Sequence, residues 1–300
     1  MKYLLIPFLL LSTPQIAQKD NLQIQHRDKI IKEINHKEFL NPLLGEPYLN
    51  QEKYDELLEE IDQQAFIEPK NAYINENGMI MKEKAGFKLY RKQFTEKFLQ
   101  YFYEKEPRKI TIPLLSLHPK VDSELLASIR TQRIGQYITY FNKNNKERAN
   151  NITLATEAIN NHVVFPGETF SFNEVVGKRT IEKGYLSAPV IIKGELSEGI
   201  GGGICQVSST LFNAADNAGV EIVQRYSHSR KVPYVPPGRD ATVSWYGPDF
   251  TFKNKYNQPL LIRAKIYGGQ MIVQLFSSDV IEFEQRKVPS MKNVKKLNRS

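Results

Sequence analysis

Hydrophobic residues recur with the spacing of one helix face in several parts of the chain. In the segment that begins at Asn50, the positions Tyr54, Leu57 and Ile61 fall on one side, with acidic residues between them. A later segment places Val207, Leu211 and Ala218 on one face. Four helices are therefore predicted, within 50–66, 90–105, 145–164 and 204–218.

Alternating hydrophobic residues predict strands between these helices. Ala72 and Ile74 alternate on one side of an "NENG" turn, and Met79 and Met81 on the other, which predicts a β-hairpin. The last pattern is a hairpin whose Gly268-Gly269 pair supplies the positive φ angles of a two-residue turn. Further strands are predicted within 109–119, 168–173, 188–199, 220–226, 240–247 and 249–254. The fold class is α+β, with a mostly antiparallel sheet and packed helices in the larger part and a small α+β module before it.

Composition shows a folded protein whose positive charge lies mainly at one end. The 300 residues are 41% hydrophobic and 11% aromatic, enough for one large core or two moderate ones. The last sixteen residues hold six Lys or Arg and no acid, against a formal net charge of +8 for the chain. Such a tail suits an anionic envelope polymer or membrane surface, or is simply a solvated end, and we expect no nucleic-acid partner.

The first residues have the organisation of a secretory signal. Lys2 precedes an apolar run from Tyr3 to Leu11, which is far shorter than the ~20 residues of a membrane-spanning helix. Cleavage near Ala17 is expected, but Gln15 occupies a position that prefers a small side chain, so an uncleaved anchor stays open. The sequence therefore predicts a secreted or cell-wall-associated protein outside the cytoplasm.

The single cysteine, Cys205, stands behind Gly201, Gly202 and Gly203 and close to the start of a predicted helix. One cysteine cannot form an internal disulfide, so the thiol is buried, reactive, metal-bound or paired with another molecule. A helix start stabilises a thiolate, and its free N–H groups could form an oxyanion hole. The competing interpretation is a small buried residue beside glycines that allow close packing.

A nucleophilic cysteine needs a base and a residue that orients the base. His228 and Asp240 follow Cys205 in the order found in papain-like hydrolases, although only 23 residues separate the cysteine from the histidine. His162 is the other candidate base. The same three residues could be ligands of a zinc ion, but none of them has the short ligand spacing of most zinc sites. We therefore expect no metal and no cofactor.

Several unusual blocks resemble the VanW family, named for a vancomycin-resistance accessory protein. They are "PGETFSFNEVVGKRTIEKGYLSAPVI", "GIGGGICQVSSTLFNAA", "HS", "YVPPGRDATVSW" and "FKNKYNQPLLIRA". Before them, "EPKNAYI", "KAGFKL" and "TIPLL" resemble a peptidoglycan-binding module that often precedes the VanW domain. The resemblance implies a signal peptide at 1–18, a linker at 19–49, a peptidoglycan-binding-like module at 50–117, a VanW-like domain at 118–283 and a basic tail at 284–300.

The resemblance also implies a cell-wall role in Gram-positive bacteria, without a defined biochemical activity. The first hypothesis is a non-catalytic accessory protein that binds peptidoglycan or its stem peptides. The alternative is a cysteine-dependent hydrolase or acyl transferase acting on those peptides, with Cys205 as nucleophile, His228 as base and Asp240 as the orienting group. Ligand contacts are expected from Gly201, Gly202, Gly203, Gln206, Ser208, Ser209 and Arg239. The distance between Cys205 and His228 separates the two hypotheses.

Overall fold

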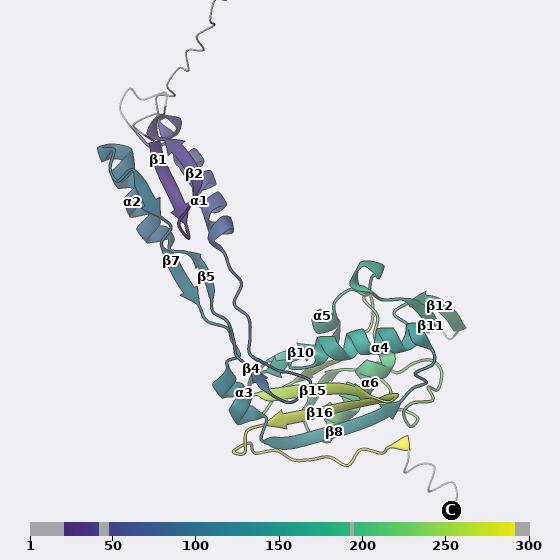
Figure 1. Ribbon diagram of the computed structural model, residues 1–300. Coiled ribbons are helices and arrows are strands. Elements are labelled where there is room, and N and C mark those ends of the chain that lie inside the picture. Colours follow the sequence, from purple (N-terminus) through teal and green to yellow (C-terminus); the bar gives the residue numbers. More distant parts are fainter. Residues whose placement is uncertain (1–20, 42–47, 193–194, 292–300) are drawn as a thin grey trace, which may run out of the picture. The chain divides into compact units, whose positions relative to one another are not determined.

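The computed structural model describes residues 21–41, 48–192 and 195–291 (Figure 1). Their contacts divide the chain into two compact units, one made of residues up to 70 together with 84–119, the other of 71–83 together with the residues from 120 onward. The signal peptide expected at 1–18 lies outside the described residues. Within the described residues, no helix has the length and apolar character needed to cross a membrane.

The first unit is a small α+β body. Its three-stranded sheet has the order β2-β1-β6, with β1 antiparallel to β2 and parallel to β6. A second pair of strands, β5 and β7, is antiparallel. The elements are β1 (Asn21–His26), β2 (Lys29–Asn35), a 3-10 helix η1 (His36–Phe39), α1 (Gln51–Ala65), β5 (Gly86–Leu89), α2 (Arg91–Glu104), β6 (Lys109–Thr111) and β7 (Leu114–Leu117).

An aromatic cluster holds this unit together. Phe98 on α2 is fully buried and its ring packs against those of Phe39, Tyr54, Phe94 and others. The predicted helices at 50–66 and 90–105 are confirmed as α1 and α2.

The linker predicted at 19–49 is wrong in its first half. Residues 21–35 form two paired strands, and Leu22 and Ile24 on β1 are completely buried. Their alternation with polar neighbours is a period-two pattern, but it spans too few residues to stand out from a polar background. The strand becomes stable because β6, far along the chain, pairs with its other edge.

The predicted "NENG" hairpin is confirmed as β3 (Tyr73–Ile74) and β4 (Ile80–Met81). It belongs to the second unit rather than to the 50–117 module. The Ile74 carbonyl accepts hydrogen bonds from Asn161 and from the buried guanidinium of Arg263. The 50–117 module drawn from the sequence therefore includes a segment, 71–83, whose contacts lie in the other unit.

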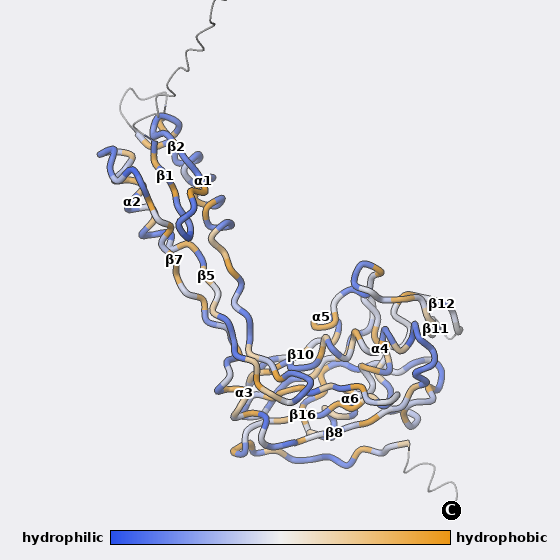
Figure 2. The backbone as a smooth tube through the Cα atoms, in the orientation of Figure 1, coloured by the Kyte–Doolittle hydropathy of each residue, from blue (hydrophilic) through white to orange (hydrophobic). Residues whose placement is uncertain are grey.

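The second unit is built on a four-stranded antiparallel sheet with the order β8-β16-β15-β9. Helices α4 and α6 contribute to one continuous hydrophobic core with this sheet (Figure 2). A smaller antiparallel sheet has the order β10-β14-β13, and β11 and β12 form a hairpin. The α+β class with mostly antiparallel sheets is confirmed.

The strands of this unit are β8 (Gln132–Tyr140), β9 (Val163–Val164), β10 (Thr169–Ser171), β11 (Ser187–Ile192), β12 (Glu195–Ile200), β13 (Glu221–Gln224), β14 (Thr251–Lys253), β15 (Leu260–Tyr267) and β16 (Gln270–Ser277). Its helices are α3 (Ser123–Ile129), α4 (Lys146–Ile159), α5 (Phe172–Val176), the 3-10 helix η2 (Ile181–Lys183) and α6 (Ile204–Asn217).

Helix α6 lies very close to strand β8. A Cβ atom at Gly135 would lie only 2.4 Å from the Ala214 carbonyl oxygen and 2.7 Å from the Ala218 Cβ. Small residues on both elements therefore permit the contact, and α6 is buried along most of its length. Gly219, with φ of 77°, directly follows the C-cap of this helix, where a residue without a Cβ is favoured.

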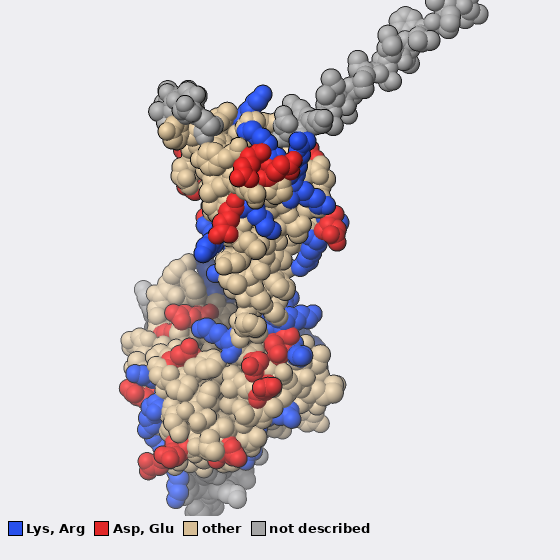
Figure 3. Space-filling view, turned by 90° about the vertical axis from the view of Figure 1, so that its left-hand side faces the viewer, with Lys and Arg blue, Asp and Glu red and all other residues tan. Residues whose placement is uncertain are grey.

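Two predicted features of this unit need correction. The segment 240–247 is a loop rather than a strand, because its backbone groups bond to side chains of α6 and to other loops instead of to a strand partner. The tail predicted from 284 onward is in part packed on the unit: the Tyr137 hydroxyl donates to the Pro289 carbonyl, and the Arg286 N–H donates to the Asn217 carbonyl. On the face drawn in Figure 3, basic and acidic residues are interspersed.

Candidate functional site

Cys205 is the second residue of α6, as the sequence predicts. Gly203 is the N-cap, and no side chain caps this end of the helix. The backbone N–H groups of Ile204 and Gln206 donate to the carbonyls of Gly201 and Gly203, at 3.2 and 3.0 Å. The Cys205 N–H has no acceptor among the described residues. The thiol therefore sits beside a free backbone donor at the positive end of a 14-residue helix.

The three glycines before the cysteine serve the backbone in different ways. Gly201 and Gly203 have φ of 87° and 108°, a region that disfavours any residue with a Cβ. A Cβ at Gly202 would lie 2.5 Å from the Ala188 carbonyl oxygen on β11. Gly201 and Gly203 line the cavity described below, as expected for ligand contacts, whereas Gly202 is buried against the hairpin.

The structure brings Cys205, His228 and Asp240 together. Asp240 accepts two hydrogen bonds on the same carboxylate oxygen, one from the backbone N–H of His228 and one from its ring Nδ1, both 2.6 Å long. His228 lies within electrostatic reach of the Cys205 thiol, whose own hydrogen-bond contacts are with Thr242 and Val243. Since Nδ1 bonds to Asp240, Nε2 is the ring nitrogen that remains available to a thiol proton. The side chains of His228 and Asp240 are only 5% and 9% exposed.

Electrostatic coupling in this group favours a charged pair. Burial raises the pKa of the Cys205 thiol, but the interaction with the nearby His228 side chain outweighs it and brings this pKa below its ordinary value. Burial lowers the pKa of His228, while Cys205 and Asp240 raise it further than burial lowers it. The pKa of Asp240 is below its ordinary value because, against burial, its carboxylate accepts both His228 bonds. The arrangement therefore stabilises a thiolate beside an imidazolium.

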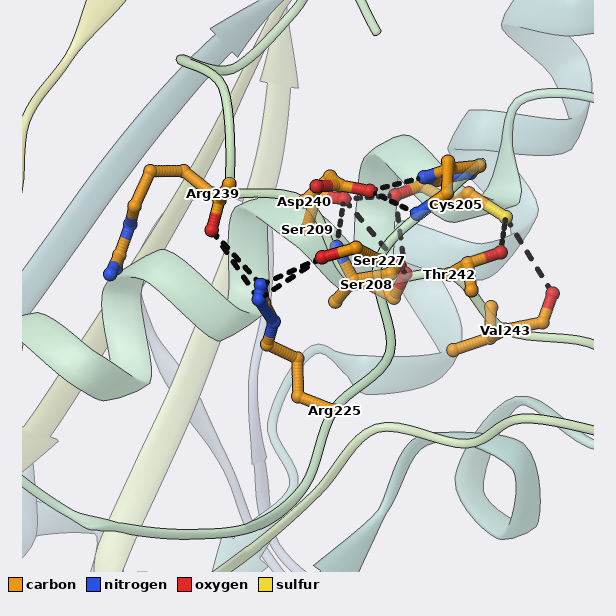
Figure 4. A network of polar contacts seen from close by, with 12 residues as sticks. Cys205, Ser208, Ser209, Arg225, Ser227, Arg239, Asp240, Thr242 and Val243 are labelled. Atoms are coloured by element: carbon orange, nitrogen blue, oxygen red, sulfur yellow. Dashed lines mark hydrogen bonds and ion pairs between the residues drawn. The ribbon is translucent and has the colours of Figure 1, made fainter. Parts of the chain in front are cut away.

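The loop that carries Asp240 is fastened to α6 by two buried serines (Figure 4). Ser208 donates to the Ala241 carbonyl at 2.5 Å. Ser209 accepts from the Ala241 N–H at 2.9 Å and donates to the Cys205 carbonyl at 2.6 Å. Both serines are completely buried and neither lines the cavity, so their position does not support the prediction that they contact a ligand. Their hydroxyls satisfy backbone groups that would otherwise be buried without partners.

The same loop surrounds the sulfur. The thiol lies 3.8 Å from the Thr242 hydroxyl and 3.6 Å from the Val243 carbonyl oxygen (Figure 4). These are long, weak contacts, which orient the thiol without consuming its capacity to react. Cys205 is partly exposed, so the sulfur is held in place and still reaches the cavity.

Gln206 lines the cavity but its amide is fully engaged. It donates to the Thr139 hydroxyl and to the Tyr140 carbonyl, both at 3.0 Å, and its oxygen accepts from Arg148 at 2.8 Å. The side chain is almost completely buried. Its main effect is to hold Arg148, and through it one wall of the cavity.

Arg239 was expected to contact a ligand, and its position in the structure does not support this prediction. Its guanidinium donates to Asn213 and Asp216 on α6, at 2.8 and 2.7 Å, and lies 4.6 Å from the centre of the Phe212 ring. It does not line the cavity. Its planar guanidinium instead fixes the turn before Asp240 onto α6.

His162, the other candidate base, is remote from the thiol site. Its ring packs edge-on against Phe170, and burial lowers its pKa. A zinc site is not supported either. Among the described residues, no group of three or more His, Cys, Asp and Glu side chains is arranged to hold a metal ion.

A cavity of about 1150 Å³ opens over the thiol. Cys205 and His228 line it together with residues that sequence reasoning missed. The main additions are Arg148 on α4, Arg179 after α5 and the exposed aromatic residue Trp245. Arg148 looks like one of many polar residues on a helix face, and Arg179 like a loop cation, so no sequence pattern marks them. Only the fold places them beside the cysteine.

Comparison with known proteins identifies the family of this chain. The family model described as "VanW like protein" matches residues 147–276, a range that contains Cys205, His228 and Asp240. The protein YoaR of Bacillus subtilis (strain 168) is 58% identical over 289 residues, which is 96% of this chain and 95% of YoaR. The vancomycin B-type resistance protein VanW of Enterococcus faecalis (strain ATCC 700802 / V583) is 30% identical over 132 residues, 42% of this chain and 48% of that protein. No solved structure gives a significant match. The chain belongs to the VanW-like family, and along nearly its full length it is a relative of YoaR.

Proposed function

We propose that this protein is a cysteine-dependent acyl-transfer enzyme, a hydrolase or transferase, that acts on peptides of the cell wall. The observation that carries the proposal is that Cys205 and His228 line one open cavity, within electrostatic reach of each other, while Asp240 holds the ring of His228 by a 2.6 Å hydrogen bond. A nucleophile, a base and a group that orients the base are the three parts that such chemistry needs.

The proposed reaction begins with attack of the Cys205 thiolate on a peptide carbonyl. A carbon–sulfur bond forms, and the carbonyl oxygen takes up the negative charge beside the free Cys205 N–H, which acts as the oxyanion donor. As the tetrahedral intermediate collapses, the carbon–nitrogen bond breaks and the His228 imidazolium gives its proton to the leaving amine. The product is a thioester on Cys205.

The thioester is then resolved by water or by an amine of a second peptide. His228 takes a proton from this nucleophile as its bond to the acyl carbon forms, and the thiolate leaves. Asp240 keeps Nδ1 occupied throughout, so that Nε2 exchanges the protons. Water gives hydrolysis, and an amine gives transfer.

The substrate class rests on relatedness and on the N-terminal sequence. The VanW relative is named as a vancomycin B-type resistance protein. The signal-like first residues of this chain predict export to the compartment where wall peptides lie. Wall peptides are therefore the first substrates to test. Cell fractionation of a tagged full-length protein tests the location, and recovery in the cytoplasm alone would contradict export.

The activity test compares the wild-type protein with Cys205→Ala and His228→Ala on purified muropeptides, with products identified by mass spectrometry. Wild-type protein should yield shortened or exchanged peptides, and both variants should not. Equal product from all three would exclude cysteine catalysis. Binding of muropeptides by wild-type and Cys205→Ala protein without any turnover would instead favour the non-catalytic binding role.

A further inference from the structure

Positive charge gathers around the cavity without acidic residues to balance it. Arg148, Arg179 and Lys178 line the cavity, and among the described residues no Asp or Glu does. In the described part of the chain, neither arginine forms an ion pair with a carboxylate. Arg239, by contrast, pairs with Asp216. The cavity therefore presents cations to whatever binds beside Cys205.

Both cavity arginines are held by neutral acceptors. Arg148 donates Nη2 to the Gln206 amide oxygen at 2.8 Å. Arg179 donates Nη2 to the Asn173 amide oxygen at 2.8 Å, and its Nη1 is buried without a hydrogen-bond acceptor among the described residues. These amides orient the guanidinium groups, and the charge of Asp249 reaches Arg179 without forming an ion pair with it among the described residues.

Burial makes this arrangement costly to the free protein. Desolvation lowers the pKa of Arg148 and of Arg179, and each lies within electrostatic reach of the Cys205 sulfur. An arginine stays charged under such conditions, so partly buried cations remain without a carboxylate partner. A planar guanidinium is suited to a carboxylate, which forms charge-assisted and often paired hydrogen bonds with it.

We propose that Arg148 and Arg179 are specificity-determining residues that bind a free carboxylate of the substrate, next to the carbonyl attacked by Cys205. The inference rests on the proposed function, since the acyl group must reach Cys205. The substrate class is then a peptide with a free carboxylate close to the scissile bond, and the corresponding peptide amide is a poor substrate. The neutral amides of Gln206 and Asn173 serve to position the two guanidinium groups.

A different use of the arginines is to stabilise the thiolate alone. The two roles differ in what they recognise. Stabilisation of the thiolate accelerates every reaction of Cys205 equally, whatever the charge of its partner. Recognition of a carboxylate acts only on reagents that carry one.

The test uses N-iodoacetylglycine and N-iodoacetylglycinamide, which share one reactive carbon and differ only in a terminal acid or amide. Each forms a sulfur–carbon bond at Cys205 and releases iodide. The chain has a single cysteine, so labelling reports this site alone. For each thiol we take the ratio of the rate constant with the acid to the rate constant with the amide. This ratio should be about tenfold higher for Cys205 in the wild-type protein than for the free thiol N-acetylcysteine, as expected for one charge-assisted hydrogen bond.

Variants identify the residues responsible. Arg148→Gln and Arg179→Gln should each lower the ratio, and Arg179→Lys should lower it as well, because lysine keeps the charge but loses the planar donor pair. Lys178→Gln is the matched control, since it removes a charge at the exposed rim of the same cavity. A wild-type ratio equal to that of N-acetylcysteine would overturn the proposal, as would a ratio unchanged by both arginine variants or reduced equally by Lys178→Gln.

Two further measurements test the carboxylate site without relying on the arginine variants. N-acetylglycine, but not N-acetylglycinamide, should protect wild-type Cys205 from alkylation by iodoacetamide. This measurement uses only the wild-type protein, so it does not depend on whether a variant folds. If Cys205 reacts only as an ordinary thiol, the proposed acyl-transfer function fails by itself. Selective binding of N-acetylglycine over its amide by the Cys205→Ala protein, followed by NMR titration, then decides the carboxylate site separately, and equal binding of both would reject it.

Discussion

Replacing Asp240 by asparagine tests whether the aspartate controls the thiol through His228. The change keeps the size of the side chain and an oxygen that can still accept the His228 backbone N–H. It removes the negative charge from a side chain that is 9% exposed and 2.6 Å from the ring nitrogen. The loop should therefore stay in place while the imidazolium loses its counter-ion.

The size of the effect follows from that one contact. A hydrogen bond to a charged group contributes about 1.5–3 kcal/mol, and one pKa unit corresponds to about 1.4 kcal/mol. Both side chains are too buried for solvent screening to reduce this greatly. Loss of the carboxylate should therefore raise the apparent pKa of the Cys205 thiol by about one to two units. The charge of Asp240 also repels the thiolate, but from beyond the ring, so the direct contact with His228 outweighs it.

The assay is the rate of alkylation of Cys205 by iodoacetamide from about pH 4 to 9, fitted to the fraction of thiolate. Wild-type protein should be labelled well below the ordinary thiol pKa of ~8.5, and Asp240→Asn should require higher pH. Asp216→Asn is the matched control. It removes a partly buried carboxylate that lies on the same helix as Cys205 and accepts hydrogen bonds from Arg239 and Arg286. An unchanged or lower apparent pKa in folded Asp240→Asn protein would show that the aspartate does not act through His228.

Three further outcomes are expected from equilibrium unfolding in urea. Gly202→Ala should cost about 1–3 kcal/mol, since its Cβ would meet backbone at 2.5 Å; Gly238→Ala, at a positive φ with open space around it, should cost less, and equal losses would contradict the packing argument. Ser209→Ala should lower the free energy of unfolding by about 1–3 kcal/mol because it leaves the buried Ala241 N–H unpaired. An unchanged stability would show that the clamp, the hydrogen bonds of Ser208 and Ser209 to Ala241, does not need Ser209. Burial raises the pKa of Asp216, but two arginines outweigh it and lower this pKa below its ordinary value of 3.8. The contribution of Asp216 to the free energy of unfolding, about 1–2 kcal/mol, is therefore present above pH 3.8 and lost as the pH falls through the pKa of the folded protein. The stabilities of wild type and Asp216→Asn should converge in acid, and a constant difference between them would refute this.

The sequence was most informative where one local pattern decides the structure. The periodic helices, the two glycine-containing hairpins and the place of Cys205 at a helix start all follow from neighbours within a few residues. The grouping of Cys205 with His228 and Asp240 could be suggested from their order and the family resemblance. The sequence could not supply the contact itself, since that depends on how the loop before β14 folds back onto α6.

The ligand contacts that the structure does not support share one physical cause. Ser208, Ser209 and Arg239 were expected to bind a ligand because polar residues near a reactive thiol commonly do. In the fold their polar groups satisfy buried backbone and side-chain partners instead. Sequence does not reveal which side of α6 faces the cavity when both sides are buried. Arg148, by contrast, was not predicted to contact a ligand, because in the sequence it is an ordinary helix residue. Only the tertiary structure brings it to the cavity beside Cys205.

The loop from His228 to Val243 explains why the site needs so many buried hydroxyls. A strand at 240–247 would have its backbone groups satisfied by a neighbouring strand, and its side chains would alternate between two faces. Because this segment is irregular, the hydroxyls of α6 provide the hydrogen bonds that its backbone groups need. Residues close together in the sequence can then point toward Cys205 and His228: Asp240 bonds to His228, while Thr242 and Val243 contact the sulfur. The clamp by Ser208 and Ser209 thus fixes the distance between nucleophile and base from the same helix that carries the nucleophile. A loosened clamp should therefore raise the apparent thiol pKa as well as reduce stability, and Ser209→Ala protein that loses stability but keeps the wild-type alkylation profile would separate the two roles.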